Sequence, residues 1–168
     1  MLDIFLPLGF LTAILLVDRV GRVPLQMFGF GMMTIALLIL AFAEGLSGGP
    51  KAHIPLVLVG FAIFNFFMNA GPNSTTYALP AEVFPSEIRA AGHGFAAACA
   101  KLGAAVGVFL FPILLASIGT SALLYCVAGT TVLALIITRI FRIETTGKSF
   151  DEISGRKLQE LAPRPSPP

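Results

Sequence analysis

Long apolar stretches with few polar interruptions make up most of the chain and end near residue 140. Five of them approach or reach the roughly 20 residues that a helix needs to cross a hydrocarbon core about 30 Å thick. They cover residues 2–17, 23–43, 54–79, 90–118 and 121–140, and the first is short at its start. The apolar positions run continuously, without the alternation of a half-buried strand, and backbone groups in lipid must pair internally. The pattern therefore predicts five transmembrane helices.

The composition supports a membrane location. Of the 168 residues, 56% are hydrophobic and 12% are charged, and the mean hydropathy is +0.88. A soluble domain carries about 25% charged residues, so this chain lacks the polar surface of a water-facing globule. We predict an all-α membrane protein with a helical region at 1–143 and a charged tail at 144–168. The tail is expected to be disordered from about residue 162, and its earlier part fits a solvated segment or a docking helix.

Basic residues indicate which side of the membrane each loop faces, because lysine and arginine gather in cytoplasmic loops. Arg19 and Arg22 lie in the first loop, Arg89 lies in the third, and the tail is rich in both residue types. The second loop contains Lys51, and the fourth loop, around Gly119, contains no charge. The N-terminus is therefore expected outside and the tail in the cytoplasm, in the plasma (inner) membrane.

Other classes of function are disfavoured by the residues that the chain lacks. The net charge of +2 is too small for a nucleic-acid surface, so no nucleic-acid partner is expected. Cys99 and Cys126 lie in apolar runs without metal-site spacing and are expected to be buried thiols. The sequence contains no nucleophile–base pair, metal-ligand cluster or phosphate-cradling loop, so we predict no enzyme, no metal and no cofactor.

Lys101 is the strongest candidate for a functional residue. In a helix that begins near Ala90 it lies about 16 Å along the axis, near the bilayer centre. A lysine at that depth costs at least ~2.5–3.5 kcal/mol, and the small residues around it allow either close helix packing or an open cavity. No carboxylate lies mid-span in this chain. The lysine is therefore expected to face an anionic substrate or a proton-carrying carboxylate; the alternative is an ion pair that only fixes helix packing.

A polar stripe is expected on one face of the third helix. Its members are Asn65, Asn69 and Asn73, followed by Thr76 or Tyr77. Their spacing of three to four residues places them on the same side of a helix. Gly71-Pro72 interrupts this segment and is expected to loosen its backbone. The stripe fits a substrate path opposite Lys101, or hydrogen bonds between helices.

His93 lies near the cytoplasmic end of the helix that carries Lys101, eight residues earlier and roughly 12 Å away along the axis. An imidazole in this place fits a proton relay, or a histidine that is bonded to a helix cap or a loop.

Three motifs resemble signatures of the major facilitator superfamily of transporters. Asp18-Arg19-Val20-Gly21-Arg22 resembles its D-R-x-G-R loop, and residues 79–89 resemble the P-x-E-x-F-P-x-x-x-R segment after the tenth span of sugar porters. Glu144-Thr145-Thr146-Gly147-Lys148-Ser149 looks like their P-E-T-K-G motif after the twelfth span, with Ile143 where proline is expected. On this alignment the five predicted helices correspond to spans 8–12. The resemblance implies a partial C-terminal half of a twelve-span bundle.

Within the superfamily, residues 69–77 most resemble the N-F-G-P-N-T-T-T-F stretch of phosphate:proton symporters, although Ala70 and Ser74 depart from it. Gly92-His93-Gly94 and Lys101-Leu102-Gly103 resemble that family's G-H-G and K-L-G. The resemblance implies that Lys101 binds phosphate and that the asparagines line the site. The chain has no tryptophan, which hexose porters carry in the tenth span, so an oxyanion is favoured over a sugar.

The loop motifs also imply a cytoplasmic ion-pair network that holds one face closed and breaks during transport. Its members would be Asp18, Arg19, Gly21, Arg22, Glu82, Arg89 and Glu144. Individually weak ion pairs suit a reversible latch, although the same residues also serve as markers of the cytoplasmic side.

The predicted function is that of a fragment of a proton-coupled transporter of a small anion, with inorganic phosphate as the favoured substrate. A sugar or organic-acid porter of the same superfamily is the alternative. A non-transporting membrane partner or assembly protein is a second alternative, based on Gly103-x-x-x-Gly107 and the tail. The expected partners are the lipid bilayer, the anion, protons and a missing N-terminal half, from the same gene or a separate chain. A truncated gene, a split half and an independent short protein remain open.

Overall fold

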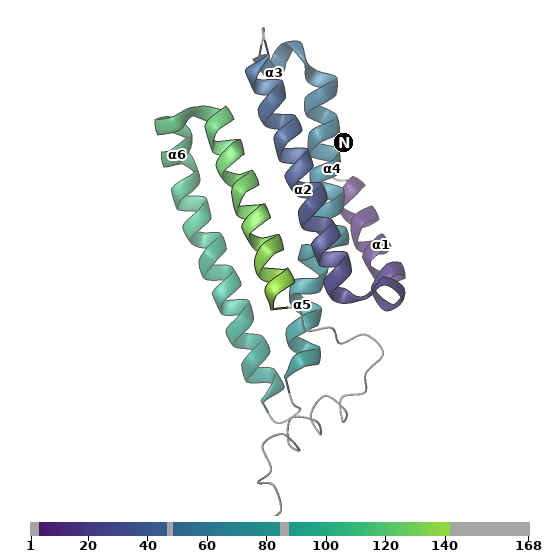
Figure 1. Cartoon of the computed structure of the whole chain (residues 1–168). Helices are drawn as coiled ribbons and strands as arrows, with labels where there is room; N and C mark the ends of the chain where they lie inside the picture. The colour runs from purple at the N-terminus through teal and green to yellow at the C-terminus, as the bar shows by residue number, and fades with distance from the viewer. Residues whose placement is uncertain (1–3, 47–48, 85–87, 142–168) are drawn as a thin grey trace, which may run out of the picture.

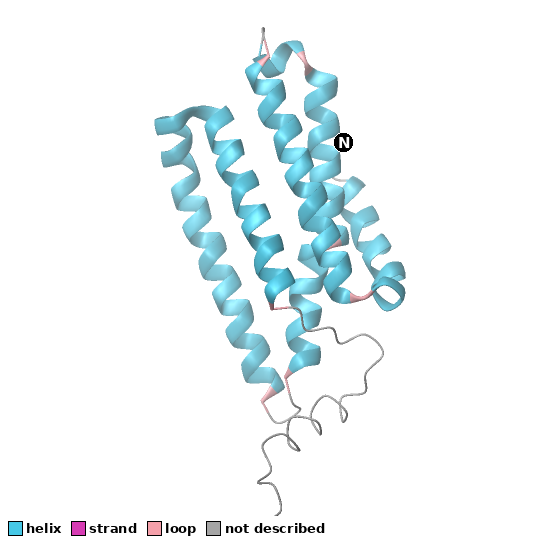
Figure 2. Cartoon of the chain, in the orientation of Figure 1, coloured by secondary structure: helices cyan, strands magenta, loops and turns pink. Residues whose placement is uncertain are grey.

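The computed structural model describes residues 4–46, 49–84 and 88–141, and all regular structure in these ranges is helical (Figure 2). The helices are α1 (Phe5–Val20), α2 (Arg22–Gly45), α3 (Gly49–Ala52), α4 (Ile54–Ala70), α5 (Pro72–Val83) and α6 (Arg89–Ile140). The predicted tail at 144–168, with the site candidate Glu144, lies outside the described residues.

The helix α6 is a hairpin of two antiparallel arms (Figure 1). Gly119 has φ 79° and ψ 169°, and at this residue the chain reverses direction. Because a side chain at positive φ is strained, glycine is the residue suited to this turn. We name residues 89–118 the first arm and residues 120–140 the second arm. The turn falls where the uncharged fourth loop is predicted.

Three stretches of the described residues are long and apolar enough to cross a membrane, and not five. They are residues 22–45, 54–80 and 89–140, the last of which contains both arms of α6. The first predicted span corresponds to α1, which has 16 residues and an axial length of about 24 Å, shorter than the hydrocarbon core.

The third predicted helix is broken into α4 and α5. Gly71 has φ −118° and ψ −98°, which is not helical, and Pro72 begins the next helix. Proline has no backbone N–H, so it cannot continue the hydrogen-bond ladder of α4. The loosening expected at Gly71-Pro72 is therefore confirmed as a break between two helices, and α4 and α5 together form the apolar stretch 54–80 that corresponds to the third predicted span.

The connections that carry the sequence motifs gather at one end of the bundle (Figure 1). The turn between α1 and α2, the end of α5, the start of α6 and the end of its second arm all lie there. The α3 segment and the Gly119 turn lie at the opposite end. This arrangement follows from helices that run alternately up and down.

The helix α2 lies at the centre of the packing, with contacts to α1, α4, α5 and α6. Eight of its apolar side chains are buried: Val23, Leu25, Met33, Ala36, Leu37, Leu40, Ala41 and Ala43. Glycines permit close approach to its neighbours. A Cβ added to Gly29 would lie 2.4 Å from Pro72 Cδ, and one added to Gly60 would lie 2.8 Å from the Leu40 side chain.

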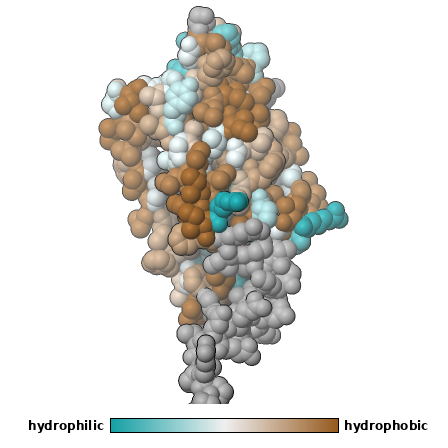
Figure 3. All heavy atoms as spheres, viewed as in Figure 1, coloured by the Kyte–Doolittle hydropathy of each residue, from teal (hydrophilic) through white to brown (hydrophobic). Residues whose placement is uncertain are grey.

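The first arm of α6 is exposed along almost its whole length, whereas the second arm packs on α2 through Leu123, Ala128 and Thr131. Apolar residues prevail over most of the described surface in Figure 3. Cys99 and Cys126 are exposed, so the expectation of buried thiols is wrong. Both lie on helical faces that no other described helix covers, and an apolar run in a membrane protein does not imply burial in the bundle.

Candidate functional site

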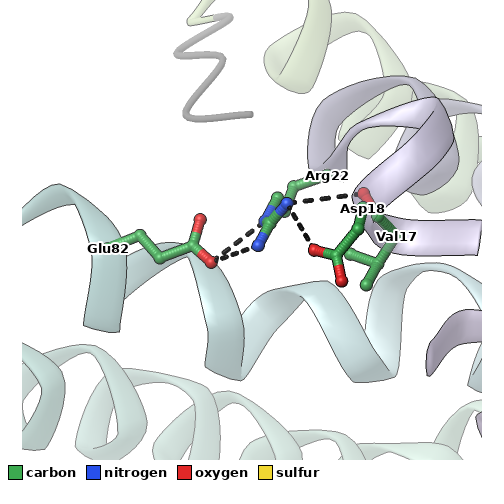
Figure 4. A network of polar contacts seen from close by, with 4 residues as sticks. All are labelled: Val17, Asp18, Arg22 and Glu82. Atoms are coloured by element: carbon green, nitrogen blue, oxygen red, sulfur yellow. Dashed lines mark hydrogen bonds and ion pairs between the residues drawn. The ribbon is translucent and has the colours of Figure 1, made fainter. Parts of the chain in front are cut away.

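An ion-paired cluster connects α2 to the end of α5 (Figure 4). Arg22 donates to Glu82 Oε1 from Nη2 at 2.7 Å and from Nε at 3.0 Å. The two side chains are only 17% and 21% exposed, so water screens this pair less than it screens a surface pair. The guanidinium fixes the spacing between two helices whose contacting ends are 60 residues apart in sequence.

The start of α2 places Arg22 within reach of α1 as well. Gly21 has φ 100°, which allows the sharp turn between the two helices. Arg22 Nη1 lies 3.2 Å from Asp18 Oδ1 and 3.4 Å from the carbonyl oxygen of Val17. Asp18 is 77% exposed, so its contribution is weaker than that of Glu82. Arg22 of α2 is thus the shared partner of α1 and α5.

The remaining candidates of the predicted network are placed differently. Arg19 is exposed next to Asp18, and no hydrogen bond or ion pair joins it to another described residue. Arg89, at the start of α6, donates from Nε to the carbonyl oxygen of Phe84 at 3.3 Å. The structure therefore brings together Asp18, Arg22 and Glu82, around the turn at Gly21. Whether they form a gate stays a prediction.

The asparagine stripe forms a hydrogen-bonded ladder along α4 and across the break. Asn65 donates to Phe61 O, Asn69 donates to Asn65 O at 2.7 Å, and Asn73 donates to Asn69 Oδ1 at 2.8 Å. Ser74 Oγ donates to the Asn69 carbonyl oxygen at 2.6 Å. The polar side chains thus bridge the place where the backbone ladder stops.

Asn69 is not an open member of a substrate path in this structure. It is 1% exposed, and a Cβ added to Gly9 of α1 would lie 2.9 Å from Asn69 Cβ. The helix α1 therefore packs onto Asn69. Asn73 is half-buried, and Thr76 and Tyr77 are exposed. Asn65 of α4 is half-buried as well, so the exposed members of the stripe, Thr76 and Tyr77, lie in α5.

Lys101 lies on the exposed first arm of α6, and no hydrogen bond or ion pair joins it to another described residue. A Cβ added to Gly103 or Gly107 would meet no atom within 4 Å, so this part of the arm is not packed against another helix. The alternative for Lys101, an ion pair that only fixes helix packing, is not found among the described residues.

His93 and Tyr77 bring α5 and α6 together near the ion-paired end. Their ring centroids are 6.4 Å apart at an interplanar angle of 68°. His93 Nδ1 is buried and has no hydrogen-bond partner among the described residues, so the expected bond to a cap or loop is not made through this atom. With Tyr77 opposite His93, the antiparallel helices place Asn69 and Lys101 at similar heights, each about two turns further along.

Sequence reasoning missed two polar contacts that organise the bundle. Thr34 of α2 and Thr131 of the second arm share a hydrogen bond of 2.8 Å between their hydroxyl groups. Thr75 is completely buried and donates to the carbonyl oxygen of Gly71, next to the break. Single threonines in apolar helices carry no spacing signal, so the sequence does not indicate which of them face a neighbour.

Known proteins are similar to this chain in sequence and in fold. The family model described as "Sugar (and other) transporter" matches residues 7–156. The chain is 42% identical over 159 residues to probable inorganic phosphate transporter 1-6 of Arabidopsis thaliana, a match that covers 90% of this chain and 29% of that protein. It is 40% identical over 172 residues to inorganic phosphate transporter 1-6 of Oryza sativa subsp. japonica, covering 94% of this chain and 32% of the rice protein.

A solved structure is similar over most of the chain. It is that of the major facilitator superfamily proton:xylose symporter bound to 6-bromo-6-deoxy-D-glucose. The TM-score is 0.81 at 24% sequence identity, and the match covers 92% of this chain and 33% of the symporter.

The fold and the sequence relatives define an integral membrane protein of the major facilitator superfamily. More closely, the chain belongs to the sugar (and other) transporter family. It spans about a third of the length of the curated relatives that it matches, and these relatives are transporters.

Proposed function

We propose that this chain works within a proton-coupled transporter of a small anion, and that the anion is inorganic phosphate. The substrate is supported by relatives of 36–42% identity that are named as inorganic phosphate transporters. Within the chain, the observation that carries the proposal is Lys101, an exposed cation that has no partner among the described residues and lies in an apolar part of the first arm.

In the proposed site, Lys101 neutralises the anion and α5 supplies hydrogen bonds. Asn73, Thr76 and Tyr77 are the reachable polar groups of α5. Asn69 supports them indirectly, because its Oδ1 accepts the Asn73 amide and fixes the orientation of that side chain. A charged amine with neutral donors around it suits an oxyanion that carries several acceptor oxygens.

The Arg22 cluster acts, in this proposal, as a latch on the cytoplasmic side. Its hydrogen bonds to Glu82 hold the end of α5 against α2, and they would break when that end of the bundle opens. Asp18 adds a weaker contact to the same guanidinium. Arg19, Arg89 and Glu144 would complete the charged surface on this side.

We propose five membrane crossings, made by α1, α2, α4 with α5, and the two arms of α6. At 1.5 Å per residue the first arm is about 45 Å long and the second arm about 32 Å, so each is long enough to cross the hydrocarbon core. The N-terminus would lie outside and the C-terminus in the cytoplasm of the plasma membrane, because the end that carries Arg19, Arg22 and Arg89 should face the cytoplasm. The chain would function together with spans that correspond to the other two thirds of its relatives.

Phosphate uptake by a chimera tests the proposal. The matching segment of the rice transporter is replaced by this chain, and uptake of radiolabelled phosphate is measured in cells without their own carrier. We expect Lys101→Ala to weaken phosphate affinity by about tenfold or more, because a charged hydrogen bond is worth ~1.5–3 kcal/mol. Lys101→Arg keeps the charge and should retain more affinity.

Lys51→Ala is the matched control, since Lys51 is an exposed lysine of α3 far from the proposed site. It should leave uptake unchanged. Unaltered phosphate affinity in Lys101→Ala contradicts the assigned role of this lysine. Uptake of xylose in place of phosphate would support the sugar-porter alternative, and a folded chimera that transports neither would support a non-transporting partner.

A further inference from the structure

The side chain of His93 lies at the contact between α5 and α6, and its ring nitrogen Nδ1 is buried. Nδ1 has no hydrogen-bond partner among the described residues, and the ring stands edge-to-face against Tyr77. A neutral imidazole has a donor on one nitrogen and an acceptor on the other, so Nδ1 lacks a bond in either tautomer. A buried polar atom without a partner destabilises the arrangement in which it occurs.

The surroundings leave little room for a partner while the two helices are in contact. A Cβ added to Gly92 would lie 2.6 Å from the Phe84 ring, so the end of α5 presses on the first turn of α6. From α5, the ionisable groups on this side are Tyr77 and Glu82, and Glu82 Oε1 already accepts two bonds from Arg22 of α2. Arg89 precedes His93 by one turn on α6, and it adds positive charge.

A second unpartnered atom lies at the same end of the bundle. Gln26 Oε1 of α2 is buried without a hydrogen bond among the described residues, one turn beyond Arg22. Two such atoms at one end of the bundle indicate that its polar interior is incompletely satisfied in this arrangement, because buried polar groups in native structures are nearly always bonded. The missing bonds are expected to form in another arrangement of these helices.

We propose that His93 is a proton-binding residue of this chain, and that protonation of Nδ1 is coupled to separation of α5 from α6. With the helices in contact, a proton on Nδ1 would place a charge in a buried site without an acceptor, which is unfavourable. Separation brings water to Nδ1, where the lone pair takes a proton from hydronium and releases a water molecule. When the helices close again, the proton returns to water.

The coupling rests on the proposed transport function, for which it supplies a proton site inside the chain. Imidazole is suited to the task because it gains and loses a proton near neutral pH. The same linkage works in both directions, since a ligand or proton that binds one conformation better shifts the equilibrium towards it.

The test uses the whole chain in lipid nanodiscs, with histidine labelled by nitrogen-15 at both ring positions. The chain has only two histidines, so His53 in the α3–α4 connection is an internal reference. Nuclear magnetic resonance at a series of pH values reports the protonation of each ring. Spin labels at Thr76→Cys and Ala91→Cys, with Cys99 and Cys126 replaced by alanine, report the distance between α5 and α6.

We expect the label distance to increase as the pH falls, with the same midpoint as protonation of His93. His93→Gln should make the distance independent of pH, whereas His53→Gln should leave its pH dependence intact. Protonation of His93 at constant label distance would overturn the proposal, and so would a pH-dependent distance that persists in His93→Gln. The comparison of the two midpoints requires no histidine substitution, so it holds even if His93→Gln folds poorly.

Neither measurement uses phosphate or uptake. Loss of the proposed function, through unaltered affinity in Lys101→Ala, would therefore leave the titration of His93 and the helix distance unaffected. The two proposals fail by different observations.

Discussion

The helix α2 and the first arm of α6 are both apolar and rich in small residues, but their glycines lie in opposite surroundings. A Cβ on Gly29 of α2 would lie 2.4 Å from Pro72 Cδ and 3.1 Å from Gly71 Cα. A Cβ on Gly103 or Gly107 of the first arm would meet no atom within 4 Å. The charged residues differ in the same way, because Arg22 of α2 has two carboxylate partners and Lys101 has none among the described residues.

This difference shows that similar residue composition serves two purposes in one bundle. In α2, small residues let helices approach and the charge is neutralised inside the chain. In the first arm, they leave a cationic side chain uncovered. The packed helix therefore stabilises the fold, and most of the first arm presents a surface that no described helix covers.

The largest expected effect comes from matched glycine substitutions on the two helices. Gly29→Ala should lower the free energy of unfolding by about 1–3 kcal/mol, because the rigid proline ring and the backbone at Gly71 must move. Gly103→Ala should be neutral or stabilising by up to about 1 kcal/mol, since alanine favours a helix and the space is open. Thermal unfolding followed by circular dichroism in detergent measures both, and equal losses would contradict the comparison.

A smaller effect is expected from the charges of the packed helix. In a double-mutant cycle with Arg22→Ala and Glu82→Ala, the coupling energy should be about 1–2 kcal/mol, because the hydrogen bonds are charged but partly reached by water. The cycle of Arg22 with Asp18 should give less than about 1 kcal/mol, since Asp18 is largely exposed. A reversed order of the two coupling energies would show that the latch depends on α1 and not on α5.

The hydrogen bond between the hydroxyl groups of α2 and the second arm should contribute even less to the free energy of unfolding. Thr34→Val and Thr131→Val are expected to show a coupling of about 0.6 kcal/mol, which is typical of hydrogen bonds between membrane helices. Each hydroxyl also has a carbonyl acceptor in its own helix, so neither is left without a bond when the other is removed. Thr130→Val, on an exposed face of the same arm, is the control and should show no coupling to Thr34.

The smallest expected effect is that of removing the lysine of the uncovered arm. Lys101→Leu should change the free energy of unfolding in detergent by no more than about 0.5 kcal/mol, because no described residue is bonded to the amine. A loss comparable to that of Arg22→Ala would mean that Lys101 stabilises the fold. In that case its assignment to substrate binding would lose its main argument.

The turns of this fold could be predicted from the sequence, and the orientation of its side chains could not. Gly119 and Gly71-Pro72 act on the backbone locally, so their effect is visible without knowledge of neighbouring helices. The spacing of Asn65, Asn69 and Asn73 fixes a common face. The direction of that face depends on α1, which packs against Asn69 through Gly9, and no local pattern reports this contact.

The candidate site could likewise be predicted in part from the sequence. Two loop motifs identified Asp18 and Arg22 on the one hand and Glu82 on the other, and the structure brings these three side chains together. Lys101 could be identified from the cost of a charge in an apolar run. Its lack of a described partner depends on which helices surround the arm, as does the burial of His93 Nδ1. These are properties of the assembled bundle.

The uncharged reversal at Gly119 bears on how the chain enters a bilayer. The two arms of α6 form a helical hairpin whose tip contains no ionised side chain, and Arg89 and Arg139 lie near its open end. A hairpin of this kind can be inserted tip first as one unit, because no charge of the tip has to be dehydrated. Between the two arginines, Lys101 is the only side chain with a permanent charge that must enter the hydrocarbon during biogenesis.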